Sequence, residues 1–89
     1  MTGLLLVALV ELVSEASAVY EDEVLALLPR HGGSLERRLT DGREEVQVIH
    51  FAAREGLQAF LDDPDRLALR ERYGAAVPAT RVLEVTPRE

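Results

Sequence analysis

An almost unbroken aliphatic run, Leu4 to Leu12, is the feature that most restricts what this chain can form. A strand with one wet face alternates apolar and polar residues, whereas a continuous apolar run belongs to a strand covered on both faces. The run is too short to cross a bilayer. Ala16 to Ala18 loosely resemble the cleavage site of a secretory leader, but no Lys or Arg precedes the run and Glu11 interrupts it. We therefore expect a central strand in a cytoplasmic protein with no membrane partner.

The residues after this strand predict a helix. Ser14 is a suitable N-cap, and Glu15 places an anion in the first turn, where the helix dipole favours it. In this helix residues 21–23, all acidic, should face water. Pro29 marks the end, because proline cannot continue a helix. The apolar stripe recurs at steps of three and four and consists of Ala16, Val19, Tyr20, Val24, Leu27 and Leu28.

Two strands and a second helical region follow. Residues 35–40 alternate apolar and charged side chains, which suits an edge strand, and Asp41-Gly42 is a strong signal for a two-residue hairpin turn before a strand at 44–52. The next helix should break and restart at Asp63-Pro64, with Asp63 as N-cap. Gly74 ends it, and residues 80–86 alternate again as the last strand. The apolar positions of the second helical region are Leu57, Phe60, Leu61, Leu67, Leu69 and Tyr73.

The order β-α-β-β-α-β predicts a single domain over residues 1–89 with an α+β, ferredoxin-like fold. This fold is a four-stranded antiparallel sheet with two helices on one face. The first strand is aliphatic on both faces, yet the helices cover only one of them. A second copy of the chain is the simplest cover for the other face. We therefore expect a homodimer formed through the sheet face.

Charge and residue content exclude several classes of function. The net charge is −6, which argues against nucleic acid as a partner because such binding needs clustered Lys and Arg. The chain has no cysteine, so disulfides, thiolate nucleophiles and thiolate metal sites are excluded. His31 and His50 stand far apart and form no paired ligand motif. We expect no metal site and no cofactor.

The stretch "RHGGSLERR", residues 30–38, resembles an anion-binding loop at first sight. A phosphate loop needs its glycines before the N-terminus of a helix, but Gly32 and Gly33 follow the C-terminus of one, where the dipole repels anions. One of them should adopt the left-handed conformation of a helix C-cap. A cationic His31 is favoured at such an end. The stretch therefore predicts a structural joint between a helix and a strand.

Several segments resemble the dimeric α+β barrel superfamily, in which two ferredoxin-like subunits pack sheet against sheet. The nearest group is a family of small domains of unknown function. Its members share a hydrophobic first strand, a tyrosine in the second half of the first helix, a Gly-Gly before the second strand and an "E-F-P"-like end to the third strand. Their second helix carries an aromatic residue, a short acidic or serine break and then a basic residue. The corresponding features are Tyr20, "HGG" at 31–33, "IHF" at 49–51 and "AFLDDPDRLALRERY" at 59–73.

This resemblance implies a fold more firmly than a reaction. The wider superfamily includes cofactor-free monooxygenases of antibiotic biosynthesis, small isomerases, lactone-forming enzymes and haem proteins, so fold analogy restricts the chemistry little. Two features depart from the group. His50 stands where the group often has an acidic residue, and the loop between the second and third strands is shorter. Chemistry that the group runs through that acidic position is therefore in doubt here.

His50 is the candidate catalytic residue. It lies in an apolar strand, and an imidazole suits proton transfer from a small organic acid or phenol; the alternative is a core histidine with one hydrogen bond. With a two-residue hairpin turn, Arg38 pairs with Glu45 and Glu36 with Gln47. This polar set would line the dimer side, and His50 would point at the helices. A turn longer by one residue reverses the relationship.

Three further residues are candidates for binding a substrate. Glu36 and Arg38 could recognise a carboxylate or relay a proton, or could form cross-strand ion pairs on an edge strand. The hydroxyl of Tyr20 could bond a ligand, or its ring could simply fill the core. The arginines of "RLALRERY" alternate with acids, which indicates a solvated helix face.

Two functions from different classes fit these observations. The first is a cofactor-independent enzyme or binding protein for a small apolar organic molecule, of monooxygenase, isomerase or cyclase type, with a pocket between helices and sheet. The second is a non-catalytic interaction or assembly module whose function is its dimer interface. A pocket that contains a polar side chain able to exchange a proton favours the first.

Overall fold

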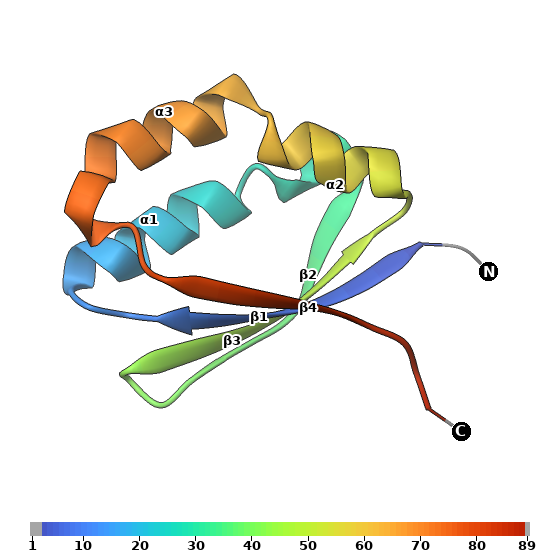
Figure 1. The fold of residues 1–89 in the computed structure, drawn as a ribbon, viewed down its shortest axis with the longest axis horizontal. Coiled ribbons are helices and arrows are strands. Elements are labelled where there is room, and N and C mark those ends of the chain that lie inside the picture. The colour runs from blue at the N-terminus through green and yellow to red at the C-terminus, as the bar shows by residue number, and fades with distance from the viewer. Residues whose placement is uncertain (1–2, 89) are drawn as a thin grey trace.

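The computed structural model describes residues 3–88, and its order of strands and helices is the expected one (Figure 1). The sheet order is β2-β3-β1-β4, with every neighbouring pair antiparallel, which is the ferredoxin-like arrangement. The strands are β1 (Leu4–Glu11), β2 (Gly33–Thr40), β3 (Glu44–Phe51) and β4 (Thr80–Val85). The helices are α1 (Glu15–Leu25), α2 (Arg54–Leu61) and α3 (Pro64–Tyr73), with short 3₁₀ turns η1 (Leu28–His31) and η2 (Gly74–Ala76).

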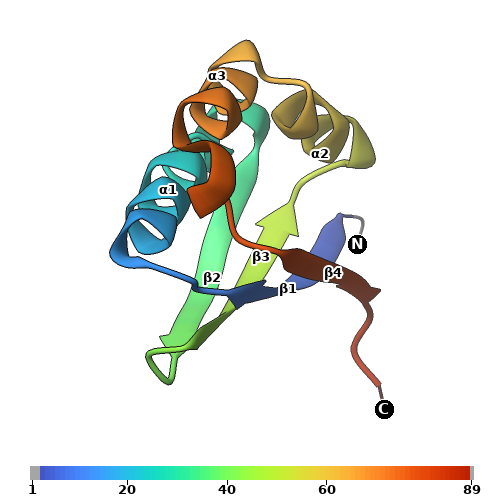
Figure 2. The ribbon, with the colours of Figure 1, turned by 60° about the vertical axis from the view of Figure 1, so that its left-hand side comes forward.

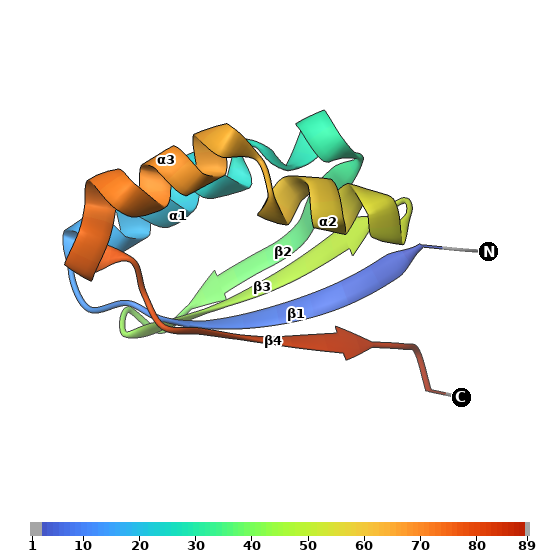
Figure 3. The ribbon, with the colours of Figure 1, turned by 45° about the horizontal axis from the view of Figure 1, so that its top comes forward.

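The aliphatic run forms the interior strand β1, as predicted, and the helices all lie on one side of the sheet (Figures 1 and 3). Along β1, the side chains that face the helices are buried, while those between them are only half-buried. The buried core consists of Leu4, Leu6, Tyr20, Val24, Leu25, Leu28, Ile49, Phe51 and Phe60. The opposite face, which carries Leu5, Val7 and Leu9, has no helix over it (Figure 2).

Most of the predicted helix ends are confirmed, but α1 ends at Leu25 and not at Pro29, which lies within the 3₁₀ turn η1. The hydroxyl of Ser14 caps α1 by accepting the N–H of Ser17. The second helical region breaks at Asp63, whose carboxylate accepts the N–H of Asp65 at 2.8 Å, and α3 begins at Pro64. Proline fits there because the first helical N–H has no partner within the helix. Gly32 has a φ of 74° at the end of η1, the left-handed C-cap that the sequence indicated.

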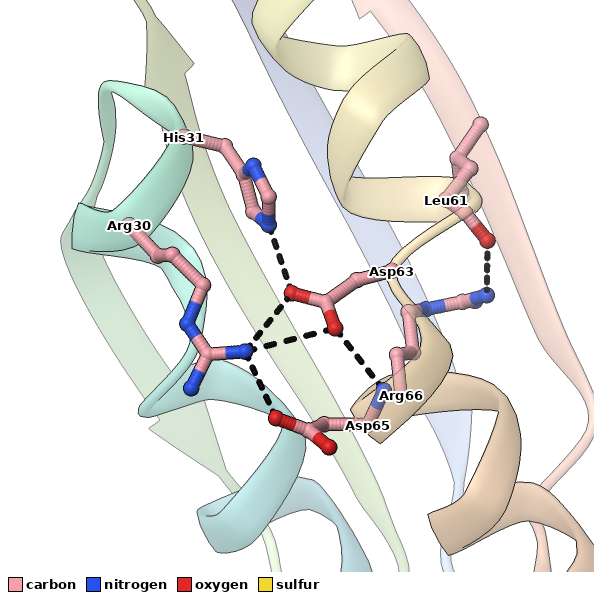
Figure 4. A network of polar contacts seen from close by, with 6 residues as sticks. All are labelled: Arg30, His31, Leu61, Asp63, Asp65 and Arg66. Atoms are coloured by element: carbon pink, nitrogen blue, oxygen red, sulfur yellow. Dashed lines mark hydrogen bonds and ion pairs between the residues drawn. The ribbon is translucent and has the colours of Figure 1, made fainter.

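The "RHGG" joint also fastens η1 to the start of α3, as Figure 4 shows. Nε2 of His31 lies 2.6 Å from a carboxylate oxygen of Asp63, and Arg30 reaches both Asp63, at 3.1 Å, and Asp65, at 2.8 Å. The hydrogen bond with His31, followed by those with the Asp65 backbone and Arg30, lowers the pKa of Asp63 to about 2. This cluster therefore has a structural role, in keeping with the sequence prediction.

The predicted face of His50 is wrong. Asp41 accepts the backbone N–H groups of Arg43 and Glu44, so the turn is longer than two residues. Across the two strands, the backbone of Arg38 consequently lies opposite Gln47, where the sequence had predicted Glu45. This shift of two residues keeps the same residues together on a face, up to a bulge at Glu36. The set under the helices, however, is the one with Ile49 and Phe51, because these supply more apolar surface than the valines beside His50. His50 consequently faces away from the helices.

The predicted buried face of α1 is also wrong by about one residue. Glu21, expected to face water, is 6% exposed, whereas Val19 is 47% exposed. The buried positions follow helical spacing and are Ser17, Tyr20, Glu21, Val24 and Leu25. This stripe is hard to recognise in the sequence because Val19 lies at the surface while Glu21, whose carboxyl group is not expected in a core, is buried. On α3, Leu67 was likewise expected inside but is 50% exposed.

Candidate active site

A cavity of about 480 Å³ lies between the helices and the sheet, with residues of β1, β3, α1, α2, α3 and β4 in its walls. Its deep wall is mainly apolar and includes Leu6, Ile49, Phe51 and Phe60, all of them buried. Residues on its outer side are exposed, notably Arg70, Thr80 and Val82. The cavity therefore opens beside the edge strand β4 and is of a size suited to a small organic molecule.

Glu21 is a buried carboxyl group in the wall of this cavity. Its Oε1 accepts a hydrogen bond of 2.8 Å from the amide nitrogen of Gln47, and it forms no ion pair with any described residue. Removal from water raises the pKa of Glu21 above its ordinary value, and the nearby charge of Glu45 adds to the rise, while the bond from Gln47 opposes it. A carboxyl group with a raised pKa, placed in the wall of an apolar cavity, is suited to exchange a proton with a bound molecule.

A chain of polar contacts holds Glu21 from the sheet side. Gln47, 2% exposed, donates its second amide hydrogen to Glu45 at 2.8 Å. Glu45 in turn accepts from Nε of Arg38 at 2.7 Å, and Arg38 also pairs with Asp22 at 2.7 Å. The arginine therefore pairs directly with Glu45, whereas Glu21 forms no ion pair with a described residue and feels the charges of Arg38 and Arg66 only at longer range.

Tyr20 and Arg66 complete the polar part of the cavity. The ring of Tyr20 packs edge-on against Tyr73 with centroids 5.6 Å apart, and its hydroxyl has no hydrogen-bond partner among the described residues. The guanidinium of Arg66 lies over the Phe60 ring, 5.3 Å from its centroid, and NH1 donates to the carbonyl of Leu61 (Figure 4). A hydroxyl and a cation therefore face the same space as the Glu21 carboxyl group.

The four residues proposed from the sequence occupy different places. Tyr20 lies on the cavity, and Arg38 reaches it only through Glu45 and Gln47. Glu36 is exposed at the bulge of β2, where it accepts the hydroxyl of Ser34. His50 is half-buried on the open face of the sheet and is not part of the cavity wall. The structure thus brings together only Tyr20 and, indirectly, Arg38.

Sequence reasoning missed Glu21, Gln47 and Arg66. A signal for Glu21 is present, because residues 17, 20, 21, 24, 25 and 28 recur at helical spacing and give a stripe that is continuous apart from its polar members. Gln47 alternates with Ile49 and Phe51, so the three share one face of β3. Arg66 gives no such signal, since nothing in "RLALRERY" separates it from the other arginines.

The described residues contain no group of three or more His, Asp or Glu side chains placed to hold a metal ion. Within residues 3–88, no helix combines the length and the apolar character that a membrane crossing requires.

Solved structures share this fold at low sequence identity. No protein-family model matches the chain, and no curated protein matches it. SnoaB, a cofactor-independent oxygenase from Streptomyces nogalater, superposes with a TM-score of 0.75 at 13% identity, over 100% of this chain and 96% of SnoaB. Rv0793 from Mycobacterium tuberculosis gives 0.70 at 17% identity, over 99% of this chain and 97% of Rv0793.

A third structure, from Caulobacter crescentus CB15, was described as an antibiotic biosynthesis monooxygenase. It gives a TM-score of 0.58 at 18% identity, over 96% of this chain and 92% of its own. These likenesses establish the ferredoxin-like fold, in agreement with the fold that the sequence predicted. At such low sequence identities, these structures show which fold the chain has but not which reaction it catalyses.

Proposed function

We propose that this protein binds and transforms a small apolar organic molecule, without a cofactor, in the cavity between the helices and the sheet. One observation carries the proposal: an apolar cavity of about 480 Å³ has in its wall a buried carboxyl group, Glu21, with a raised pKa and no ion pair to a described residue. A binding site needs mostly apolar walls with a few well-placed polar groups, and this cavity has both.

In this proposal Glu21 accepts a proton from an acidic carbon or hydroxyl of the substrate, and Gln47 holds the carboxyl group in place. Loss of a proton from carbon leaves an electron-rich carbanion. This species can react with O₂, take back a proton at another carbon, or attack a carbonyl of the same molecule. Those three outcomes correspond to monooxygenase, isomerase and cyclase chemistry, so one proton transfer underlies all of them.

A comparison with a protein of the same fold supports this proposal. SnoaB, which shares the fold over its whole length, is a cofactor-independent oxygenase. The proton-transfer role that we expected of His50 passes to Glu21, because His50 is not in the cavity wall. Arg38 keeps a supporting role through Glu45 and Gln47, and Tyr20 remains a ligand contact.

We also propose that the protein is a homodimer joined through the open face of the sheet. On that face β1, β3 and β4 carry Leu5, Val7, Leu9, Val46, Val48, Leu83 and Val85. An aliphatic surface of this kind is unfavourable in water, and a second copy is the cover that symmetry supplies most simply. An acidic chain without cysteine suits the cytoplasm, where we expect the dimer to act.

Hydrogen–deuterium exchange on an enolisable apolar ketone tests the proposed proton transfer. The protein is mixed with 2-tetralone in D₂O near neutral pH, and loss of the α-proton signal is followed by NMR. We expect the wild type to accelerate exchange and Glu21→Gln to lower the catalysed rate by about 100-fold, the usual contribution of a general base. His50→Gln serves as the matched control and should keep the wild-type rate.

Two results would count against this function. If exchange is accelerated equally by the wild type and Glu21→Gln, proton transfer does not occur at Glu21. If 2-tetralone neither binds nor exchanges faster, the protein is better described as a non-catalytic assembly module.

A further inference from the structure

Helix α3 presents two arginines, Arg66 and Arg70, to the outer part of the cavity. They are four residues apart, so they lie on the same side of the helix, one turn from each other. Neither forms an ion pair with a described residue, whereas Arg72 of the same helix pairs with Glu23 at 3.1 Å. In a chain with a net charge of −6, two adjacent cations without a carboxylate partner are unexpected.

Arg66 is the more buried of the two arginines, and its hydrogen bonding is incomplete. Its Nε is buried and has no hydrogen-bond partner, while NH1 reaches only the carbonyl of Leu61 at 3.2 Å (Figure 4). Burial, and to a smaller degree the charge of Arg70, lowers the pKa of Arg66. A buried N–H of a guanidinium group that is left unpaired costs free energy, and native proteins seldom keep such a group without a use for it.

Glu21 does not satisfy Arg66, although the two opposite charges attract each other. Glu21 accepts its hydrogen bond from Gln47 and forms no ion pair with Arg66, although both residues line the cavity. The cavity therefore has a cationic outer part and, deeper, an apolar wall with one carboxyl group. Arg70 is exposed and Glu21 is buried, which sets the order of these groups along the cavity.

From this arrangement we infer that the ligand of the cavity is an amphipathic organic anion. Its carboxylate binds Arg66 and Arg70, and its apolar body lies against Ile49, Phe51 and Phe60. The terminal nitrogens of a guanidinium group donate charge-assisted hydrogen bonds to a carboxylate, and neither Arg66 nor Arg70 forms an ion pair with a described residue that would compete for them. The anion at the outer end would direct the body of the molecule towards Glu21. This inference rests on the proposed function and adds the class of ligand to it.

Binding of a matched pair of probes to the full chain tests the inference. The probes are 2-naphthoate and its neutral counterpart 2-naphthamide, and their dissociation constants are measured by titration calorimetry at pH 7.5. We expect the wild type to bind naphthoate at least about tenfold more tightly than the amide, as for a charge-assisted hydrogen bond. Arg70→Gln, at an exposed position that should not disturb folding, and Arg66→Gln should each remove most of this preference.

Arg43→Gln is the matched control, because it removes the same charge at the exposed hairpin, away from the cavity. It should leave the preference for naphthoate unchanged. If both probes bind with equal affinity, or if Arg70→Gln and Arg66→Gln keep the wild-type preference, the inference is overturned while the apolar cavity still stands. If neither probe binds, both the inference and the proposed function fail.

Discussion

At the scale of single residues, Glu21 is a buried carboxyl group that forms no ion pair with a described residue. Its position on α1 follows from helical spacing, with Tyr20 and Val24 beside it in the core. Its only hydrogen-bond donor among the described side chains is Gln47, so the charged form is poorly compensated. Burial of this carboxyl group opposes its ionisation, which is the environment expected of a proton-exchanging group.

The pH dependence of stability, compared between the wild type and a Glu21→Gln variant, tests whether burial of the Glu21 carboxyl group opposes its ionisation. The pKa of Glu21 is higher in the folded chain than in the unfolded one, so the folded state holds the proton more tightly and stability falls as pH rises through the folded pKa. Glu21→Gln removes this loss. We expect the melting temperature of the variant to exceed that of the wild type by roughly 4 °C or more at pH 8, and the difference to disappear near pH 4.

Circular dichroism melts at both values of pH provide the measurement. Glu23→Gln is the control, because Glu23 is paired with Arg72 and lies outside the core. A Glu21→Gln variant that is less stable than the wild type at pH 8 would mean that the ionised carboxylate stabilises the fold.

At the scale of helices and strands, most of the fold could be predicted from the sequence. Helix caps at Ser14 and Asp63 and the aliphatic strand β1 are signalled by local chemistry, which acts within a few residues. The hairpin register could not be predicted, because the Asp-Gly pattern does not specify the bonds that Asp41 makes with the backbone of Arg43 and Glu44. The buried face of α1 was missed although its helical spacing is visible, because Glu21 is accommodated in the core through its bond with Gln47 of a distant strand. Gln47 is tolerated beneath the helices since Glu21 and Glu45 accept both of its amide hydrogens.

The contact between α2 and η1 depends on Gly56. A Cβ added at Gly56 would collide with the backbone carbonyl of His31, which has no freedom to move aside like a flexible side chain. Alanine normally favours a helix over glycine, so the two effects oppose each other. We expect the collision to dominate and Gly56→Ala to lower the free energy of unfolding by about 1–3 kcal/mol, the usual cost of overpacking.

Urea unfolding gives the measurement. Gln58→Ala, at an exposed position of the same helix, should change the free energy of unfolding by less than about 0.5 kcal/mol. A Gly56→Ala variant as stable as the wild type would show that η1 can move away from α2.

At the scale of the whole molecule, the structure separates two surfaces of one sheet. The face under the helices forms the cavity wall, and the open face is aliphatic and carries His50. Sequence reasoning found both surfaces but assigned His50 to the wrong one, because alternation along β3 does not say which set of residues meets the helices. The candidate site was consequently predicted only in part, through Tyr20 and the position of the pocket.

A charge at the centre of the open face tests the proposed dimer. Val7 pairs with Val48 on one side and with Leu83 on the other. A lysine buried there without a partner costs several kcal/mol, so we expect Val7→Lys to raise the dimer dissociation constant by about 100-fold or more. Sedimentation equilibrium measures this constant. Leu67→Lys, at a half-exposed position on α3, is the control and should remain dimeric; a monomeric wild type at high concentration would exclude the dimer.

The central claim is that a small apolar molecule binds between the helices and the sheet, and intermolecular NOEs locate such a molecule directly. With 2-tetralone bound to the wild-type protein, we predict NOEs from the ring protons to the methyl groups of Leu6, Val24 and Ile49, which line the cavity. NOEs to Leu5, Val7 and Val48 of the open face, with none to the cavity methyl groups, would contradict the account.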